Sequence, residues 1–217
     1  MSIPPNFCGF KKLLELHLVC VTFDSVALGS FMSGSPFLEK LCIEYCDGFE
    51  YLDISSPTLK VLLLEIIHDV KSICLKNAKN LIDFTLDANH NSLSDLIKSL
   101  PKIKRFSLFI WKKSYNYDDT TQVLGPSKEL ECLSCCCLKL QTVNIYVDAS
   151  AQHAMSLIKF ILANSPLLKT LTFNIFEESE AVNAVMFFEI SQDLLLMERA
   201  SPRARVKFKH SPYPLFW

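Results

Sequence analysis

The sequence predicts an α/β solenoid, in which short strands stack in successive coils with irregular helices between them. Two observations lead to this prediction. The phrase Ser-Pro-x-Leu occurs three times, at residues 35–38, 56–59 and 165–168. An apolar pattern of the form L-x-x-L-x-L recurs along most of the chain. A catalytic motif needs each of its groups in one place, so a phrase that recurs is expected to be structural.

The recurring pattern has the spacing of leucine-rich repeats. Its first positions are residues 13, 38, 59, 81, 103, 140 and 168, so the steps are 25, 21, 22, 22, 37 and 28 residues. Steps of about 20–29 residues are typical of such repeats. The alternative is an ordinary β-rich domain whose register matches by chance. The seven copies are Leu13-Leu16-Leu18, Leu38-Leu41-Ile43, Leu59-Leu62-Leu64, Leu81-Phe84-Leu86, Ile103-Phe106-Leu108, Leu140-Val143-Ile145 and Leu168-Leu171-Phe173.

Each copy predicts one strand and one turn. The x-L-x-L part alternates with period 2, as a half-buried strand does. The Ser-Pro before the leading Leu prevents a preceding helix from continuing. Weaker apolar triplets, Phe49-Leu52-Ile54 and Val70-Ile73-Leu75, divide two of the repeats into steps of roughly 11 residues. We expect these triplets to form short strands on the opposite side of the coil.

In the middle of the chain, two segments predict helices and one predicts a loop. Ser92 and Asp95 suit a capping box for residues 92–100. In residues 151–163 the apolar residues recur at helical spacing, with Asp148 or Ser150 as the N-cap and Asn164 at the end. Residues 112–137 follow neither period and predict an insertion loop, which accounts for the 37-residue step.

The C-terminal part predicts a helix and an edge strand. An apolar stripe extends the helix from Glu178 to about Ala200, and Pro202 follows it. In the strand at residues 205–210, Val206 and Phe208 share one face, and Arg205, Lys207 and Lys209 share the other. Charges on an edge strand prevent further pairing. A nucleic-acid role is the alternative, but no aromatic residues alternate with these charges as a stacking platform requires.

Composition excludes several classes of protein. The chain has 217 residues, half of them apolar, with 22 basic and 23 acidic residues. A net charge of −1 gives no general attraction to nucleic acid or to an anionic membrane. The N-terminus does not read as a signal peptide, and no apolar run is long enough to span a bilayer. The nine cysteines are odd in number and lie mostly in apolar runs, which predicts a reduced protein of the cytosol or nucleus.

No motif predicts catalysis, a cofactor or a metal. The stretch Cys132-x-x-Cys135-Cys136-Cys137 lacks the second ligand pair of a structural zinc site, and His153 is its nearest candidate partner. Gly29 and Gly34 have the spacing of a P-loop, but Ser35-Pro36 stand where Lys-Ser/Thr is required. The other candidates are explained as core or surface residues: His17, His68, His90, Asp118-Asp119 and Glu177-Glu178. We therefore expect no enzyme activity and no catalytic, cofactor or metal residues.

The second half of the chain resembles the FBD domain of plant F-box/FBD/LRR-repeat proteins. The first strand matches at Leu140, Val143 and Ile145, the helix at Leu157, Phe160 and Leu162, the turn at Ser165-Pro166-Leu168, and the closing signature at Arg199-Ala200-Ser201-Pro202. Upstream, FKKLLELHL, SPFLEKLCI and SPTLKVLLL are similar to the repeats of the same family. The resemblance implies leucine-rich repeats over 1–110, the insertion loop over 111–137, and an FBD domain over 138–217 with the order strand-helix-strand-helix-strand.

The sequence departs from this family in two places. Tyr146-Val147-Asp148-Ala149 stands where the family has a phenylalanine-glycine element. The family begins with an F-box of roughly fifty residues that binds the adaptor of an SCF ubiquitin ligase, whereas this sequence opens inside the repeats. Binding to the SCF adaptor is therefore not expected.

The resemblance implies a non-enzymatic protein-interaction module of the substrate-recognition type, which binds an unknown target protein through the solenoid surface. We expect no membrane and no nucleic-acid partner. Two alternatives stay open: a truncated remnant without independent activity, with Leu14, Leu16 and Leu18 exposed, or a decoy without an F-box that shields a target.

Overall fold

A computed structural model describes residues 9–23, 25–48, 50–65, 72–75, 77–87, 103–110, 139–147, 151–176 and 184–211. The chain divides into two compact units, residues 1–105 and 106–217. The helix predicted at 92–100 and the insertion loop predicted at 112–137 lie outside the described residues.

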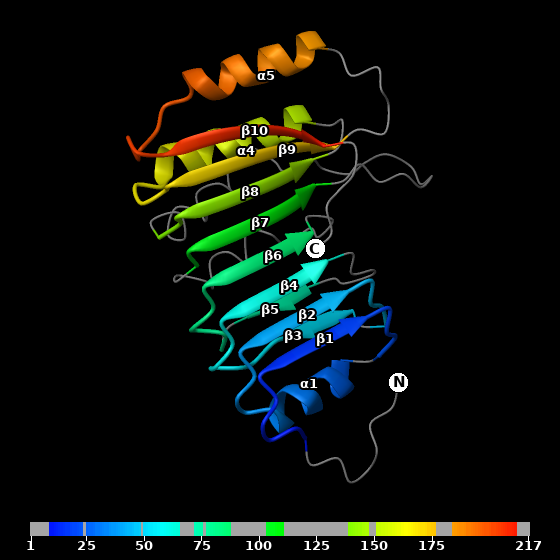
Figure 1. Cartoon of the computed structure of the whole chain (residues 1–217). Coiled ribbons are helices and arrows are strands. Elements are labelled where there is room, and N and C mark those ends of the chain that lie inside the picture. Colours follow the sequence, from blue (N-terminus) through cyan, green and yellow to red (C-terminus); the bar gives the residue numbers. More distant parts are fainter. Residues whose placement is uncertain are drawn as a thin grey trace. The chain divides into compact units, whose positions relative to one another are not determined.

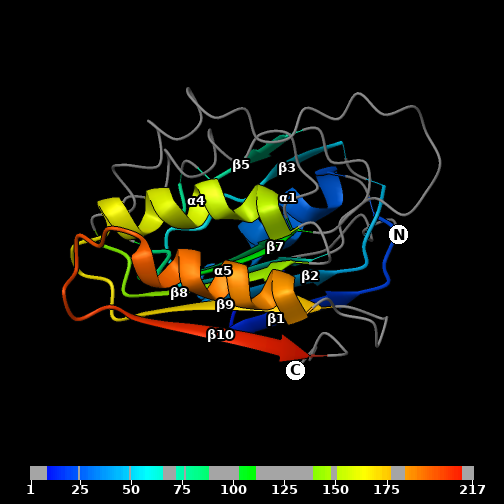
Figure 2. The same ribbon diagram turned by 90° about the horizontal axis from the view of Figure 1, so that it is seen from above.

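Unit 1 is built on a parallel sheet with the strand order β1-β2-β4-β6. A second, two-stranded parallel sheet joins β3 and β5. Figure 1 shows the longer strands side by side, and Figure 2 shows β3, β5 and α1 on one side of them. The elements are β1 (Glu15–Val19), α1 (Ser25–Gly34), β2 (Lys40–Glu44), β3 (Tyr51–Asp53), β4 (Val61–Glu65), β5 (Ser72–Cys74) and β6 (Asp83–Asp87).

The period-2 pattern places one row of side chains from each strand in the core. Both apolar strand positions of the repeat are fully buried in β2, β4 and β6: Leu41, Ile43, Leu62, Leu64, Phe84 and Leu86 all have 0% exposure. Leu52 and Leu75, from the weaker triplets, close the other side of this core. The strands predicted from the strong and the weak apolar triplets are thus confirmed in the described part of unit 1.

Each Ser-Pro phrase forms a tight turn. The amide of Leu38 donates to the carbonyl of Ser35 at 3.1 Å, and Leu59 and Leu168 make the same bond to Ser56 and Ser165 at 3.4 and 3.1 Å. Proline suits the second position of such a turn because its φ is already fixed near the required value. The serines are buried, and the turn directs the next leucine into the core.

Helix α1 was not expected from the sequence. Its segment SVALGSFMSG contains two glycines and three serines, which disfavour helix in isolation. Ala27, Leu28 and Met32 are nevertheless buried, so packing against the rest of unit 1 stabilises the helix. Gly9 has a φ of +78°, and a Cβ there would overlap the backbone of Gly34. Gly29 and Gly34, which have P-loop spacing, both lie inside this helix.

Unit 2 is also built on a sheet with helices packed on it, and its strands are longer than those of unit 1. Its strands are β7 (Arg105–Ile110), β8 (Thr142–Val147), β9 (Thr170–Phe176) and β10 (Arg205–Ser211), in that order across the sheet. Helix α4 (Ala151–Asn164) packs on β8, and α5 (Ala184–Leu196) packs on β10. The helix predicted to end at Asn164 and the charged strand at residues 205–210 are both confirmed.

The predicted end of the last helix was wrong. Helix α5 ends at Leu196 rather than near Ala200. The Arg199 guanidinium turns back to donate to the carbonyls of Leu194 (3.4 Å) and Ala204 (3.2 Å), and the Ala200 amide donates to Leu162 at 2.9 Å. These bonds hold residues 199–204 in a non-helical connection. Among the described residues, no helix has the length and apolar character needed to cross a bilayer.

Candidate functional site

The candidate site is the outward face of each sheet, by which we mean the strand side chains opposite the buried core rows. In unit 1 the outward face alternates with the fully buried leucines and is made by every second residue of the strands. These residues are Glu15, His17, Val19, Lys40, Cys42, Glu44, Val61, Leu63, Glu65, Asp83, Thr85 and Asp87.

Ion pairs link neighbouring strands at the start of the outward face of unit 1. Lys40 Nζ lies 3.4 Å from a carboxylate oxygen of Glu15. The Arg105 Nε, at the boundary of this unit, donates to Asp83 at 2.8 Å. Such exposed pairs are worth about 0–1 kcal/mol each, so they assist strand register more than stability.

A row of acidic groups lies at the other end of the same strands. Glu44 is directly opposite Glu65 in the register of β2 and β4, and Asp87 also acts on Glu65 electrostatically. Burial, followed by the charges of Glu44 and Asp87, raises the pKa of Glu65 to about 7. Its Oε1 is buried and has no hydrogen-bond partner among the described residues. Burial and the charge of Glu65 also raise the pKa of Tyr45.

A group of possible metal ligands borders the acidic row. His17 and Cys42 are paired in the register of β1 and β2, and Glu44 follows Cys42 on the same face. One donor atom from each of the three lies within 4.8 Å of the other two. Cys42 is buried, which raises the pKa of its thiol to about 11, while the imidazole of His17 is exposed.

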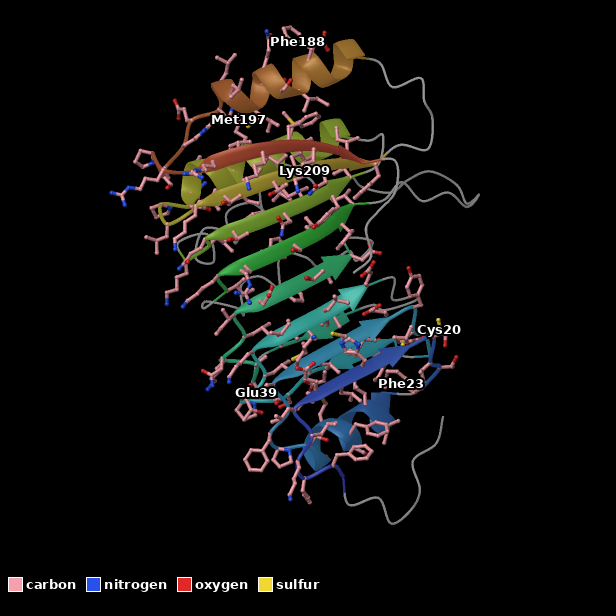
Figure 3. All side chains as sticks on the ribbon, in the orientation of Figure 1. Cys20, Phe23, Glu39, Phe188, Met197 and Lys209 are labelled. Atoms are coloured by element: carbon pink, nitrogen blue, oxygen red, sulfur yellow. The ribbon has the colours of Figure 1, made fainter. Side chains whose placement is uncertain are left out.

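The outward face of unit 2 carries aromatic rings. Phe109 and Tyr146 stack with ring centroids 4.4 Å apart and an interplanar angle of 8°, and Tyr146 and Phe176 stack at 5.8 Å and 5°. In the register of β9 and β10, the exposed Lys209 aligns with Asn174, which aligns with Tyr146. Lys209 is labelled on β10 in Figure 3. The result is a row of half-buried and buried rings bordered by a cation.

Several candidates named from the sequence lie outside the described residues. These are His68, His90, Asp118-Asp119, Cys132, Cys135, Cys136, Cys137 and Glu177-Glu178. His153 belongs to α4, but its side chain is outside the description. His17, which the sequence indicates to be a surface or core residue, is exposed on β1 and lies beside two other donor groups.

Aligning the repeats could have found this group from the sequence. The first step of the repeat is 25 residues, from Leu13 to Leu38. Adding 25 to 17 places His17 opposite Cys42, and the observed register agrees. The pairing has no local motif, because His17 and Cys42 lie on different strands.

This chain is similar to one known protein family and to one known protein. The family model for the LRR repeats of FBD-associated F-box protein At5g56370 matches residues 1–108. The F-box/FBD/LRR-repeat protein At1g13570 of Arabidopsis thaliana is 27% identical over 179 residues, which cover 77% of this chain and 41% of that protein. The chain thus spans about two fifths of the length of the curated relative that it matches. Both matches point in the same direction: the chain is similar to plant F-box/FBD/LRR-repeat proteins.

Proposed function

We propose that this chain is a non-enzymatic protein-interaction module, and that the outward face of its strands binds a target protein. In the finer form of the proposal, it acts like the substrate-recognition part of an SCF ubiquitin ligase. The family relation supports an interaction role. Strand faces of repeat proteins suit this role because they present many side chains on one broad surface.

The observation that carries the proposal is the aromatic row of unit 2. Phe109 and Tyr146 are half-buried and stacked, so their rings are held in place before any partner arrives. Rigid aromatic side chains with a polar group, such as tyrosine, are enriched among residues that dominate binding energy. The exposed Lys207 and Lys209 on β10 provide a cationic border. This surface fits a partner segment with apolar side chains at its centre and acidic groups around them.

We also propose the domain organisation expected from the sequence, with leucine-rich repeats over 1–110, an insertion over 111–137 and an FBD domain over 138–217. In this proposal the repeats form a solenoid and the FBD domain closes it. The order β8, α4, β9, α5, β10 supports the FBD part. The repeated turns at Ser35 and Ser56 support the repeat part, because each leads into a strand of the same sheet.

The test is a quantitative capture of proteins from plant cell extract by the full chain and by variants. Tyr146→Ala combined with Lys209→Glu changes the outward face of unit 2. The matched control is Lys159→Glu, an exposed substitution on α4. We expect a specific protein to be recovered with the unaltered chain and with the control. Its recovery should fall about tenfold or more with the double variant, since loss of one dominant residue costs about 2 kcal/mol.

Two outcomes would contradict the proposal. Equal recovery by the double variant and the control would show that binding does not use this face. No specific recovery by a folded, monomeric chain would favour the reading of a remnant without activity. The SCF form needs a second measurement, the stability of the captured protein in cells. Shorter half-life with added chain supports target selection, whereas a longer half-life supports the decoy.

A further inference from the structure

The strongest unassigned feature of the described residues is the group formed by His17, Cys42 and Glu44. Imidazole nitrogen, thiolate sulfur and carboxylate oxygen are the three donor types that bind zinc in proteins. The three residues come from two adjacent strands whose register is fixed by hydrogen bonding, so their backbones are already positioned. Their donor atoms all lie within 4.8 Å of one another.

A second observation near this group also points to a cation. Glu65, opposite Glu44, is 6% exposed, and its Oε1 has no hydrogen-bond partner among the described residues. A buried carboxylate oxygen without a partner is costly. Asp87 adds to the negative charge at Glu65. A positive ion at this end of the sheet would offset the repulsion between these carboxylates.

We propose that unit 1 binds one Zn²⁺ ion through His17, Cys42 and Glu44, with the fourth position facing solvent. The bound ion then reduces the repulsion between Glu44 and Glu65, which are opposite each other in the register of β2 and β4. This proposal goes beyond the proposed target binding, because the aromatic row that carries the target proposal lies in unit 2 and the ligand here is a metal ion.

The geometry requires only small side-chain movements. Tetrahedral zinc with bonds of about 2.0–2.3 Å holds its donor atoms roughly 3.3–3.6 Å apart. The donors are separated by no more than 4.8 Å, so rotamer changes of His17 and Glu44 can close the difference. His17 is exposed and Glu44 is half-buried, which leaves both side chains room to move. Cys42 is buried and provides the fixed donor.

The donor set selects the kind of metal. A thiolate and an imidazole disfavour Mg²⁺ and Ca²⁺, which prefer oxygen ligands, and favour Zn²⁺ among the abundant divalent ions. Binding replaces the thiol proton of Cys42, which passes to solvent, so a Zn–S bond forms as the S–H bond breaks. The thiolate and the Glu44 carboxylate then balance the two charges of the ion. No oxidant or reductant takes part.

The test uses Co²⁺, whose absorption reports both tetrahedral geometry and thiolate coordination. For this test, Cys132, Cys135, Cys136 and Cys137 of the full chain are replaced by serine, so that their thiols do not bind the probe metal. We expect one equivalent of Co²⁺ to produce a thiolate charge-transfer band, and one equivalent of Zn²⁺ to remove it. Variants His17→Ala and Cys42→Ser should each weaken binding about a hundredfold or more, because even loss of an outer-shell group costs roughly 10–100-fold.

Cys74→Ser is the matched control, since Cys74 is another free cysteine of unit 1 and lies on β5, away from the group. It should keep the band and the affinity. His17→Ala keeps the test valid if Cys42→Ser fails to fold, because His17 is exposed. Two results would overturn the proposal: no band at several-fold excess of Co²⁺, or a band that survives in folded His17→Ala.

Discussion

The hydroxyl of Ser201 donates a 2.7 Å hydrogen bond to the carbonyl of Leu168, which lies 33 residues earlier in the chain. Both residues belong to Ser-Pro turns, because Ser201-Pro202 repeats the Ser165-Pro166 phrase and the Ala204 amide bonds to the Ser201 carbonyl at 3.2 Å. The closing Arg-Ala-Ser-Pro signature is therefore one more turn of the same kind. The hydrogen bond from Ser201 joins the connection after α5 to the turn before β9.

This relationship predicts a difference between two buried serines. Ser201→Ala removes the bond to Leu168 and leaves a buried carbonyl without that donor, so it should destabilise the chain by about 1–2 kcal/mol. Ser165→Ala is the control, because the Ser165 hydroxyl is buried without a hydrogen-bond partner among the described residues. Its removal should be neutral or slightly stabilising. Denaturant unfolding measures both; equal losses would contradict the role given to Ser201.

The assignment of core and outward faces predicts opposite results for two neighbouring leucines of β4. Leu62 has 0% exposure, so Leu62→Ala should cost about 2–5 kcal/mol of unfolding free energy. Leu63 is half-buried on the outward face, and Leu63→Ala should cost less than about 1.5 kcal/mol. Chemical denaturation followed by circular dichroism checks the pair. A larger loss at Leu63 would mean that the faces are reversed.

Arg199 connects the end of α5 to the start of β10 through two carbonyls, those of Leu194 and Ala204. A hydrogen bond from a charged group contributes about 1.5–3 kcal/mol to the free energy of unfolding. Arg199→Met keeps most of the apolar stem but removes both bonds, and should lower the free energy of unfolding by about 1.5–3 kcal/mol. Glu198→Ala, an exposed neighbour, serves as the control and should have little effect.

Glu65 predicts how stability depends on pH in the presence of a chelator. Its folded pKa is about 7 and its ordinary value is 4.5, because burial and the charges of Glu44 and Asp87 disfavour the carboxylate. A raised folded pKa contributes stability below pH 4.5 that is lost as the pH rises to about 7. The groups facing Glu65 are Glu44 from β2, Asp87 from β6 and Tyr45 after β2.

Glu65→Gln removes this titration. The unaltered chain should lose up to about 3 kcal/mol between pH 4.5 and 7 relative to Glu65→Gln. Unfolding free energies measured across that range for both chains give the difference directly. A difference that stays constant with pH would show that Glu65 ionises normally in the folded chain.

The core of this protein was predictable because each strand contributes its own period-2 signal. The alternation of apolar and other residues within a few positions predicts the burial of Leu41, Ile43, Leu62 and Leu64. Helix α1 was not predictable by the same means. Its serines and glycines carry little local preference, and only the burial of Leu28 against other elements decides its conformation.

The candidate sites depend on register between strands, which no single segment reveals. The stack of Phe109 on Tyr146 joins residues 37 positions apart across an insertion, so repeat spacing alone is a poor guide there. His17 and Cys42 are separated by one regular step, and a repeat alignment does place them together. Neither feature has a motif of its own.

The target protein is proposed to bind the outward face of the strands. The most direct measurement places a photo-crosslinking phenylalanine derivative at Tyr146 in one chain and at Lys159 on α4 in another, and exposes both to plant cell extract under light. We expect a discrete covalent adduct with a single protein from position 146 and none from position 159. An adduct from position 159 with none from position 146 would contradict the claim, because the target would then bind the helical side of unit 2.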